Sequence, residues 1–241
     1  MKLVIFDCDG TLVDSQRMIC AAMRQAYEAN NLSVPAREQL LAIVGLSLPD
    51  AFRRLAATAN GDADHPVEAL VTCYKNAFAE LRSSVDHLEP LYPGAREAVD
   101  MLAARPDMLL GIATGKSQRG VRAVLGRHGL AERFVTIQTS DDAPSKPHPG
   151  MVLAAMRETG VMPEDTVVVG DTVFDLEMAR AAGVHAIGVA WGYHPAAALR
   201  AAGAHAMIAE FAELVPALDR LWGAGAVEGA GGLARGGRLR G

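Results

Sequence analysis

Two carboxylates close a short apolar segment near the start of the chain. Residues 3–6 are apolar, and Asp7 and Asp9 follow them with one residue between, before Gly10. Because side chains alternate along a strand, both carboxylates should point into one site at a strand's carboxyl end, where open α/β sheets place their ligands. Such a pair repels by roughly 4 kcal/mol at about 4 Å with an effective dielectric of about 20, which calls for a cation or a shared proton. A solvated Asp-Gly turn is the alternative interpretation of this motif alone.

Two further polar sites could bind a phosphate: one follows a strand-like segment, and the other precedes a helix. Thr114 and Gly115 end the apolar segment 109–113. A hydroxyl and free backbone N–H groups at a helix start can hold a phosphate, although an ordinary helix cap explains Thr114 equally well. Lys146 lies in a proline-stiffened loop before another helix, where its ammonium could neutralise a phosphoryl oxygen or a nucleophile. Taken alone, Lys146 is more simply a solvated surface lysine, and His148 between two prolines is expected to be structural.

A second pair of carboxylates suggests a metal site. Asp171 ends the strand-like segment 166–169, and Asp175 lies four residues on, so that both can point to one locus if a helix begins between them. A role as a first-turn acid of that helix is the alternative for Asp175. Oxygen ligands without a His or Cys cluster select a hard cation, and Mg²⁺ is the default.

The elements that must position these residues form a regular alternation from residue 93 onward. Strands alternating with helices of this length predict an α/β fold with a doubly wound, Rossmann-like parallel sheet and right-handed crossovers. We expect strands at 3–6, 109–113, 134–137, 166–169, 185–190 and 205–208, and helices at 95–104, 118–128, 151–159, 176–182 and 211–222.

The chain between the first two strands is too long for one crossover. No convincing strand is present between residue 15 and about residue 89, whereas a crossover needs only about a dozen residues. The surplus predicts a helical domain at 16–90, with hinges at 14–16 and 83–92. The α/β core domain then comprises 1–15 and 91–222. Residues 223–241, rich in Gly, Ala and Arg, are expected to be a disordered tail.

Composition excludes several classes of protein. The formal net charge of -5 and the lack of a long basic run argue against nucleic acid as a partner. The sequence contains no apolar segment of about eighteen residues, the length that a membrane span needs, and no secretory leader is recognised. The three scattered cysteines are typical of a reduced compartment. We therefore expect a cytoplasmic protein that is a monomer or a homodimer.

The four motifs together resemble those of the haloacid dehalogenase (HAD) superfamily of phosphohydrolases. The resemblance extends over roughly residues 2–221 and rests on the segments 7–11, 114–115, 146–147 and 170–175, in that order. The helical insertion after the first motif resembles the subfamily with a helical cap, which includes phosphoglycolate phosphatases, β-phosphoglucomutases and pyrophosphatases.

The resemblance implies a role for each catalytic residue. Asp7 would be the nucleophile that forms an aspartyl-phosphate, and Asp9 would protonate the leaving oxygen and later deprotonate water. Thr114 and the amide of Gly115 would bind the phosphoryl oxygens, and Lys146 would stabilise their charge.

The same resemblance implies a magnesium site. Its ligands would be the Asp7 side chain, the backbone carbonyl of Asp9 and the Asp171 side chain, with Asp175 acting directly or through water.

The resemblance also narrows the substrate to a small phosphorylated metabolite. An acid at position 9 separates the chain from true dehalogenases and phosphonoacetaldehyde hydrolases, which lack it. The segment 44–49 lacks the Arg expected in sugar-phosphate mutases, and Gly115 departs from the Thr-Asn-Lys-Pro of many phosphoglycolate phosphatases. 2-Phosphoglycolate is the leading substrate. A sugar phosphate, a nucleotide, pyrophosphate or a β-phosphoglucomutase-like reaction are alternatives.

Two interpretations from other classes remain at this point. A signalling receiver phosphorylated on Asp would use similar residues, but receivers are about half this length and lack the insertion. A binding module without catalysis is the second, although every expected catalytic side chain is present. Slow hydrolytic turnover would distinguish an enzyme from both.

Overall fold

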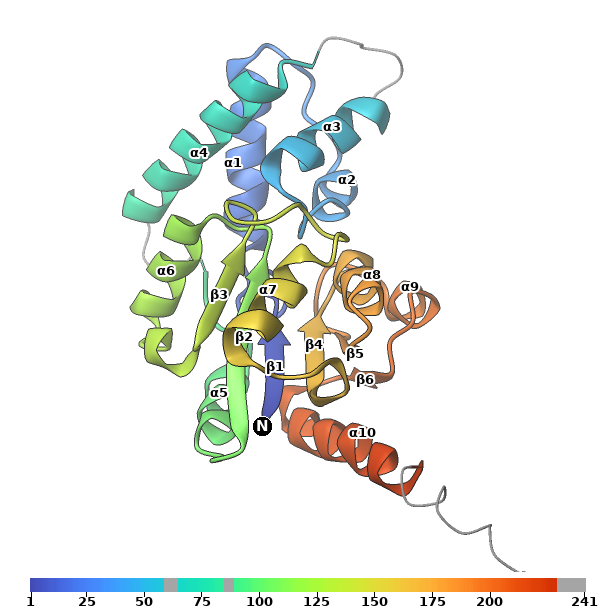
Figure 1. Cartoon of the computed structure of the whole chain (residues 1–241). Coiled ribbons are helices and arrows are strands. Elements are labelled where there is room, and N and C mark those ends of the chain that lie inside the picture. Colours follow the sequence, from blue (N-terminus) through green and yellow to red (C-terminus); the bar gives the residue numbers. More distant parts are fainter. Residues whose placement is uncertain (59–64, 85–88, 229–241) are drawn as a thin grey trace, which may run out of the picture.

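The structure is a computed structural model that describes residues 1–58, 65–84 and 89–228 (Figure 1). Within these residues, six parallel strands form one sheet in the order β3-β2-β1-β4-β5-β6. Their bounds are Lys2–Phe6 (β1), Met108–Thr114 (β2), Thr136–Thr139 (β3), Thr166–Gly170 (β4), His185–Val189 (β5) and Ala206–Ile208 (β6). The predicted doubly wound α/β sheet is therefore confirmed.

The central strand β1 places the first motif between two others. Phe6 pairs with Ile112 of β2 on one side and with Val169 of β4 on the other. Because all three strands run in the same direction, the residues that follow them lie at the same edge of the sheet. This register brings Asp7, Thr114 and Asp171 to one end of the molecule.

Helices cover both faces of the sheet. Helices α5 (Ala95–Ala103), α6 (Gln118–Arg127) and α10 (Leu214–Glu228) pack on the face to which Val4 and Phe6 point. Helices α7 (Gly150–Thr159), α8 (Val173–Ala181) and α9 (Ala196–Ala201) pack on the opposite face with Leu3 and Ile5. Since β1 is buried on both faces from Leu3 onward, its residues 3–6 are all apolar, as expected for a central parallel strand.

The helical insertion comprises α1 (Gln16–Ala29), α2 (Arg37–Leu41), α3 (Leu48–Thr58) and α4 (Val67–Ser84). It has its own hydrophobic cluster, which includes Tyr27, Phe52 and Leu70. In Figure 1 these helices lie beyond the end of the sheet toward which the strands point. The segments that lead into and out of the insertion are side by side, because the Asp14 amide donates a hydrogen bond of 2.8 Å to the Pro90 carbonyl.

Several element boundaries differ from the sequence expectation. Strand β3 begins at Thr136, two residues late, because Ala131–Arg133 forms a 3-10 turn before it. Helix α9 was not predicted. Helix α10 continues to Glu228, so residues 223–228 are helical, which contradicts the predicted tail there. Extending an existing helix adds one hydrogen bond per residue without a new nucleation cost, which favours this continuation. The rest of the predicted tail, 229–241, lies outside the described residues.

None of the helices in the described part of the chain combines the length and the apolar character needed to cross a bilayer.

Candidate active site

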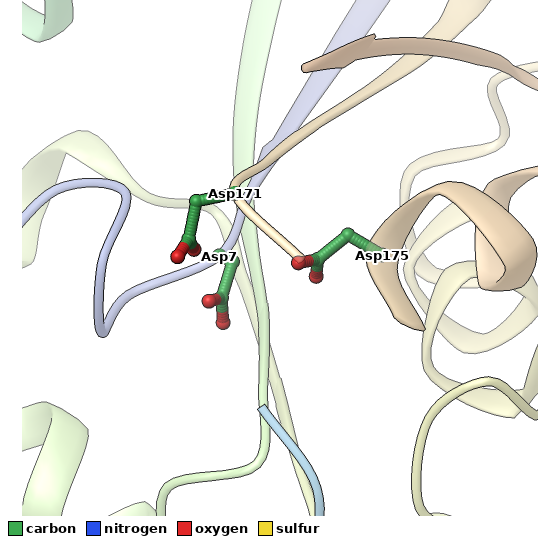
Figure 2. A group of neighbouring side chains, drawn as sticks. All are labelled: Asp7, Asp171 and Asp175. Carbon is green, nitrogen blue, oxygen red and sulfur yellow. The ribbon is translucent and has the colours of Figure 1, made fainter. Parts of the chain in front are cut away.

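Three buried carboxylates meet at the carboxyl edge of the sheet. Asp7 follows β1, Asp171 follows β4, and Asp175 is in the first turn of α8. Each offers one oxygen, and the three oxygens lie within 4.8 Å of one another. Figure 2 shows the three side chains turned toward a common space. The sequence prediction that strand ends bring these acids together is thus met by the geometry.

Lys146 lies against two of the three acids. Its ammonium donates to Asp7 Oδ1 at 2.7 Å and to Asp175 Oδ1 at 2.6 Å, and its side chain is fully buried. Burial lowers the pKa of a lysine, but here the carboxylates of Asp175 and Asp7 raise the pKa of Lys146 above its usual value. Lys146 is therefore a charged group of the site and not a solvated surface lysine.

Asp175 is also a capping residue of α8. Its Oδ2 accepts hydrogen bonds from the Thr172 amide at 3.1 Å and from the Thr172 hydroxyl at 2.6 Å. The two interpretations of Asp175 from sequence are compatible, since one oxygen caps the helix and the other pairs with Lys146.

The charges of this cluster do not balance. One ammonium faces three buried carboxyl groups, and Asp7 Oδ2 is buried with no hydrogen-bond partner among the described residues. Burial raises the pKa of Asp7, which Lys146 opposes, and burial together with Asp7 raises the pKa of Asp171. A cation would stabilise the ionised forms. Mg²⁺ binds oxygens at about 2.0–2.1 Å, so ligands on opposite sides lie about 4 Å apart. The spacing and the oxygen-only donors fit such a hard cation.

Asp171 is held by backbone as well as by side chains. Its carboxylate accepts from the Thr11 hydroxyl at 2.9 Å and from the Tyr193 amide at 2.8 Å. A Cβ at Gly10 or at Gly192 would lie only 2.2 Å or 2.1 Å from an Asp171 atom, so neither position accepts a larger residue without a shift. Sequence reasoning missed Gly192 and Tyr193, although their place just after β5, at the same edge, was a usable signal.

Asp9 has partners that differ from those of Asp7. Strand β1 ends at Phe6, and the chain then turns, with Gly10 at a φ of 92°. Alternation along a strand therefore no longer determines where the Asp9 side chain points. Its carboxylate accepts from Lys116 Nζ at 2.8 and 3.1 Å and from the Ser15 hydroxyl. The expectation that both carboxylates point into one acid site was wrong for the Asp9 side chain.

Lys116 connects Asp9 to the helical insertion. Its ammonium lies 3.0 Å from Glu89 Oε1, and Glu89 Oε2 accepts two hydrogen bonds from Arg82 of α4, at 2.9 and 2.8 Å. Glu89 is only 2 % exposed. Sequence reasoning gave neither Lys116 nor Glu89 a role. The signal for Lys116 was its place in the second motif, and for Glu89 there was none beyond its place in a hinge.

The second motif lies under the 42–47 loop of the insertion. Thr114 is buried at the end of β2, and its hydroxyl accepts from the Lys116 amide at 3.2 Å, which leaves its own proton free to donate. A Cβ at Gly115 would lie 2.5 Å from the carbonyl oxygens of both Gly45 and Leu46. The loop is also joined to the core through its Ser47 amide, which donates to Ser145 Oγ at 2.8 Å.

A cavity of about 650 Å³ lies between the insertion and the core. Asp9, Thr114, Gly115 and Lys116 form part of its wall. His148, by contrast, accepts a hydrogen bond from the Gly150 amide at the start of α7, which is consistent with the structural role expected of it.

Comparison with known proteins agrees with this geometry. The model of the family described as haloacid dehalogenase-like hydrolase matches residues 4–189, and the chain belongs to that family. A relative named probable phosphatase IndB, from Dickeya dadantii, is 36% identical over 91% of this chain and 94% of its own length. The phosphoglycolate phosphatase of Salmonella typhimurium is 29% identical over 89% of this chain and 91% of its own.

A comparison with solved structures finds proteins of similar fold. A hydrolase from Pseudomonas syringae superposes with a TM-score of 0.80 at 27% identity, covering 91% of this chain and 99% of the other. The family and the fold expected from the four motifs are confirmed.

Proposed function

We propose that this chain is a Mg²⁺-dependent cytoplasmic phosphatase that hydrolyses a small phosphomonoester through an aspartyl-phosphate on Asp7. The observation that carries the proposal is the state of the Asp7 carboxylate. One of its oxygens accepts a hydrogen bond from Lys146, and the other is buried in an acidic cluster with no partner among the residues that the structure describes. A buried carboxylate in this arrangement is a positioned nucleophile.

The reaction proceeds in two displacements. In the first, a carboxylate oxygen of Asp7 attacks phosphorus, the bond from phosphorus to the ester oxygen breaks, and the leaving oxygen receives a proton from Asp9. In the second, water attacks the aspartyl-phosphate and gives a proton to Asp9, which releases phosphate and restores the Asp7 carboxylate. The hydrogen bonds from Ser15 and Lys116 orient the Asp9 carboxyl group at the cavity wall.

The hydrogen-bond donors around Asp7 stabilise the negative charge of the phosphoryl group. The Thr114 hydroxyl, the Gly115 amide and the Lys146 ammonium bind the phosphoryl oxygens. Phosphoryl transfer asks a protein mainly for positioning and electrostatic stabilisation. Loss of one preorganised donor of this kind costs about 10²- to 10³-fold in rate.

The acidic cluster would hold the metal. We assign the side chains of Asp7 and Asp171 and the backbone carbonyl of Asp9 as its protein ligands. Asp175 already accepts three hydrogen bonds, which leaves its carboxylate at most about one free lone pair. We therefore place Asp175 as a ligand through water. When bound, Mg²⁺ offsets negative charge on the phosphoryl group.

The substrate is assigned less specifically than the type of reaction. 2-Phosphoglycolate leads because of the motif resemblance and the Salmonella relative named for it. A sugar phosphate, a nucleotide and pyrophosphate are the alternatives, and the lack of an Arg in 44–49 argues against a mutase.

The test is release of inorganic phosphate from a panel of these compounds with Mg²⁺. A kcat/KM of about 10⁴ M⁻¹s⁻¹ or more for one compound would support the proposal. Asp7→Asn and excess EDTA should each abolish release. As a second readout, Mg²⁺ without substrate should raise the Tm of the wild-type chain, and much less that of Asp171→Asn. Full activity in a folded Asp7→Asn protein would refute the nucleophile assignment. A complete lack of phosphate release would favour a receiver or a binding module.

A further inference from the structure

The cavity between the insertion and the core opens at Asp9. Among the residues of the phosphoryl site, Asp9, Thr114 and Gly115 belong to its wall, whereas Asp7 and Lys146 do not. In the proposed reaction Asp9 gives its proton to the leaving oxygen. The leaving group of the substrate must therefore extend into this cavity.

The cavity is large for the leaving group of 2-phosphoglycolate. Its volume of about 650 Å³ is in the middle of the range of about 300–1,000 Å³ for pockets that take drug-sized ligands. The same volume corresponds to about twenty water molecules at about 30 Å³ each. A two-carbon glycolate would leave most of that space to water, so the size of the cavity indicates a longer leaving group.

One part of the cavity wall is aliphatic. It is formed by Ile19 and Met23 of α1 and by Ile43, Val44 and Leu46 of the 42–47 loop. Ile19, Met23, Ile43 and Val44 are buried, whereas Leu46 and Phe78, which also line the cavity, are partly exposed, so the apolar surface that faces the cavity comes mainly from the latter two. Water against such a wall makes few hydrogen bonds, so an apolar group that displaces it gains free energy. The body of the leaving group should therefore be apolar.

Four cationic side chains also belong to the wall, and two of them are compensated. Arg82 and Lys116 share the carboxylate of Glu89, and Lys116 also pairs with Asp9. The remaining acid of the wall, Asp141, accepts a hydrogen bond from the Gln118 amide at the start of α6.

The other two cations, Lys75 and Arg119, have no compensating partner in the part of the chain that the structure describes. Lys75 belongs to α4 of the insertion and Arg119 to α6 of the core, and both are exposed. Neither forms an ion pair or a hydrogen bond with any residue in 1–58, 65–84 or 89–228. Two cations of one cavity wall without an ion pair among the described residues favour an anionic group on the ligand.

We propose that the preferred substrate is not 2-phosphoglycolate, which the motif resemblance favours, but an amphipathic phosphomonoester. Its leaving group has an apolar body longer than glycolate and ends in an anion bound by Lys75 and Arg119. This inference rests on the phosphatase function proposed above. The aliphatic wall selects the body, and the two cations select the terminal carboxylate or phosphate.

A homologous series of substrates tests the cavity. The series comprises the ω-phosphooxy carboxylates from 2-phosphoglycolate to the eight-carbon homologue, the alkyl phosphates of equal length, and the corresponding α,ω-bisphosphates. We expect kcat/KM to rise by up to about fourfold per added methylene, which corresponds to about 0.8 kcal/mol for each buried CH₂. At equal length, the esters with a terminal anion should exceed the alkyl phosphates, and the bisphosphates show whether carboxylate or phosphate is preferred.

The outcomes separate this inference from the proposed function. A maximum at 2-phosphoglycolate, or alkyl phosphates that equal the charged esters, would overturn the inference and leave a phosphatase. Failure of every compound, p-nitrophenyl phosphate included, would overturn the function itself and the inference with it.

Substitutions test the two cations. Lys75→Ala and Arg119→Ala should each raise KM for the long carboxylate ester by about twofold to fivefold, the scale of exposed ion pairs, with kcat little changed. The alkyl phosphate of the same length should be unaffected in both variants. Arg127→Ala is the matched control, because Arg127 is an exposed residue of α6 outside the cavity wall. An equal effect on the alkyl phosphate, or an equal effect of Arg127→Ala, would overturn the assignment.

Discussion

At Gly115 the backbone of the insertion closely approaches the carboxyl edge of the sheet. A Cβ there would lie 2.5 Å from the carbonyl oxygens of Gly45 and Leu46, whereas ordinary contacts begin at 3.4 Å. Both obstacles are backbone atoms, so no rotamer change relieves the contact. In Gly115→Ala, the 42–47 loop must retreat by about 0.5 to 0.9 Å, or the second motif must move by a similar amount.

The size of the effect follows from this shift. Overpacking of this kind costs about 1–3 kcal/mol, which lowers the Tm by about 2–12 °C for a chain of this length. The loop is tied to Ser145, next to Lys146, by the Ser47 amide. The displacement therefore reaches two groups, Gly115 and Lys146, that we propose as ligands of the phosphoryl oxygens. A misplacement of about 1 Å in such groups costs up to about 10²-fold in rate.

The assay is kcat/KM for phosphate release together with thermal unfolding. Gly126→Ala is the matched control, since this glycine of α6 has open space where its Cβ would go. It should keep wild-type activity and gain about 0.5–1 kcal/mol of stability. If Gly115→Ala kept kcat/KM within about twofold of wild type, the close approach of the loop would not exist in the working enzyme and the reasoning would be refuted.

Other expectations follow from the buried charges. Asp7→Asn should lower kcat below detection and keep a cooperative thermal transition, because it removes the nucleophile without a change of shape. Lys146→Met leaves two buried carboxylates without their ammonium, so urea unfolding should show a loss of about 3–5 kcal/mol, with kcat reduced at least about 10²-fold. Mg²⁺ at a hundred times its Kd should stabilise the wild-type chain by about 2.7 kcal/mol in calorimetry, and EDTA should reverse this. Burial lowers the pKa of His194 below 6.5, and its Nδ1 accepts from the Val173 amide at 3.1 Å, which requires the unprotonated ring. This stability is present above pH 6.5 and lost as pH falls through the lower folded pKa. Thermal unfolding against pH should show that loss in the wild type and a flatter profile in His194→Asn.

The sequence predicted that Asp7 and Asp171 lie close together because of their positions relative to the strands. Asp7 and Asp171 each come directly after a buried strand, and parallel neighbours end at the same edge of a sheet. Lys146 was a candidate site residue because it lies in a proline-stiffened loop just before a helix. Its burial and its contact with both Asp7 and Asp175 depended on packing that no local pattern contains.

Asp9 shows the limit of a local rule. Alternation predicts where a side chain points only while the strand continues, and β1 ends one residue before Asp7. Beyond that point, the direction of the Asp9 carboxylate depends on Lys116, which is separated from it by 107 residues.

The sequence by itself predicted the α/β class, the helical insertion, the family and the acids and lysine that the structure brings together at one edge of the sheet. It could do so because hydrophobic periodicity and strand-end position are local properties of a chain. The tertiary structure decided which charges are compensated. It links Asp9 through Lys116 to Glu89, and the Tyr193 amide holds Asp171. It also leaves two cations of the cavity wall without a partner among the described residues. These depend on distances between segments far apart in the sequence, which only the packing of the insertion against the sheet determines.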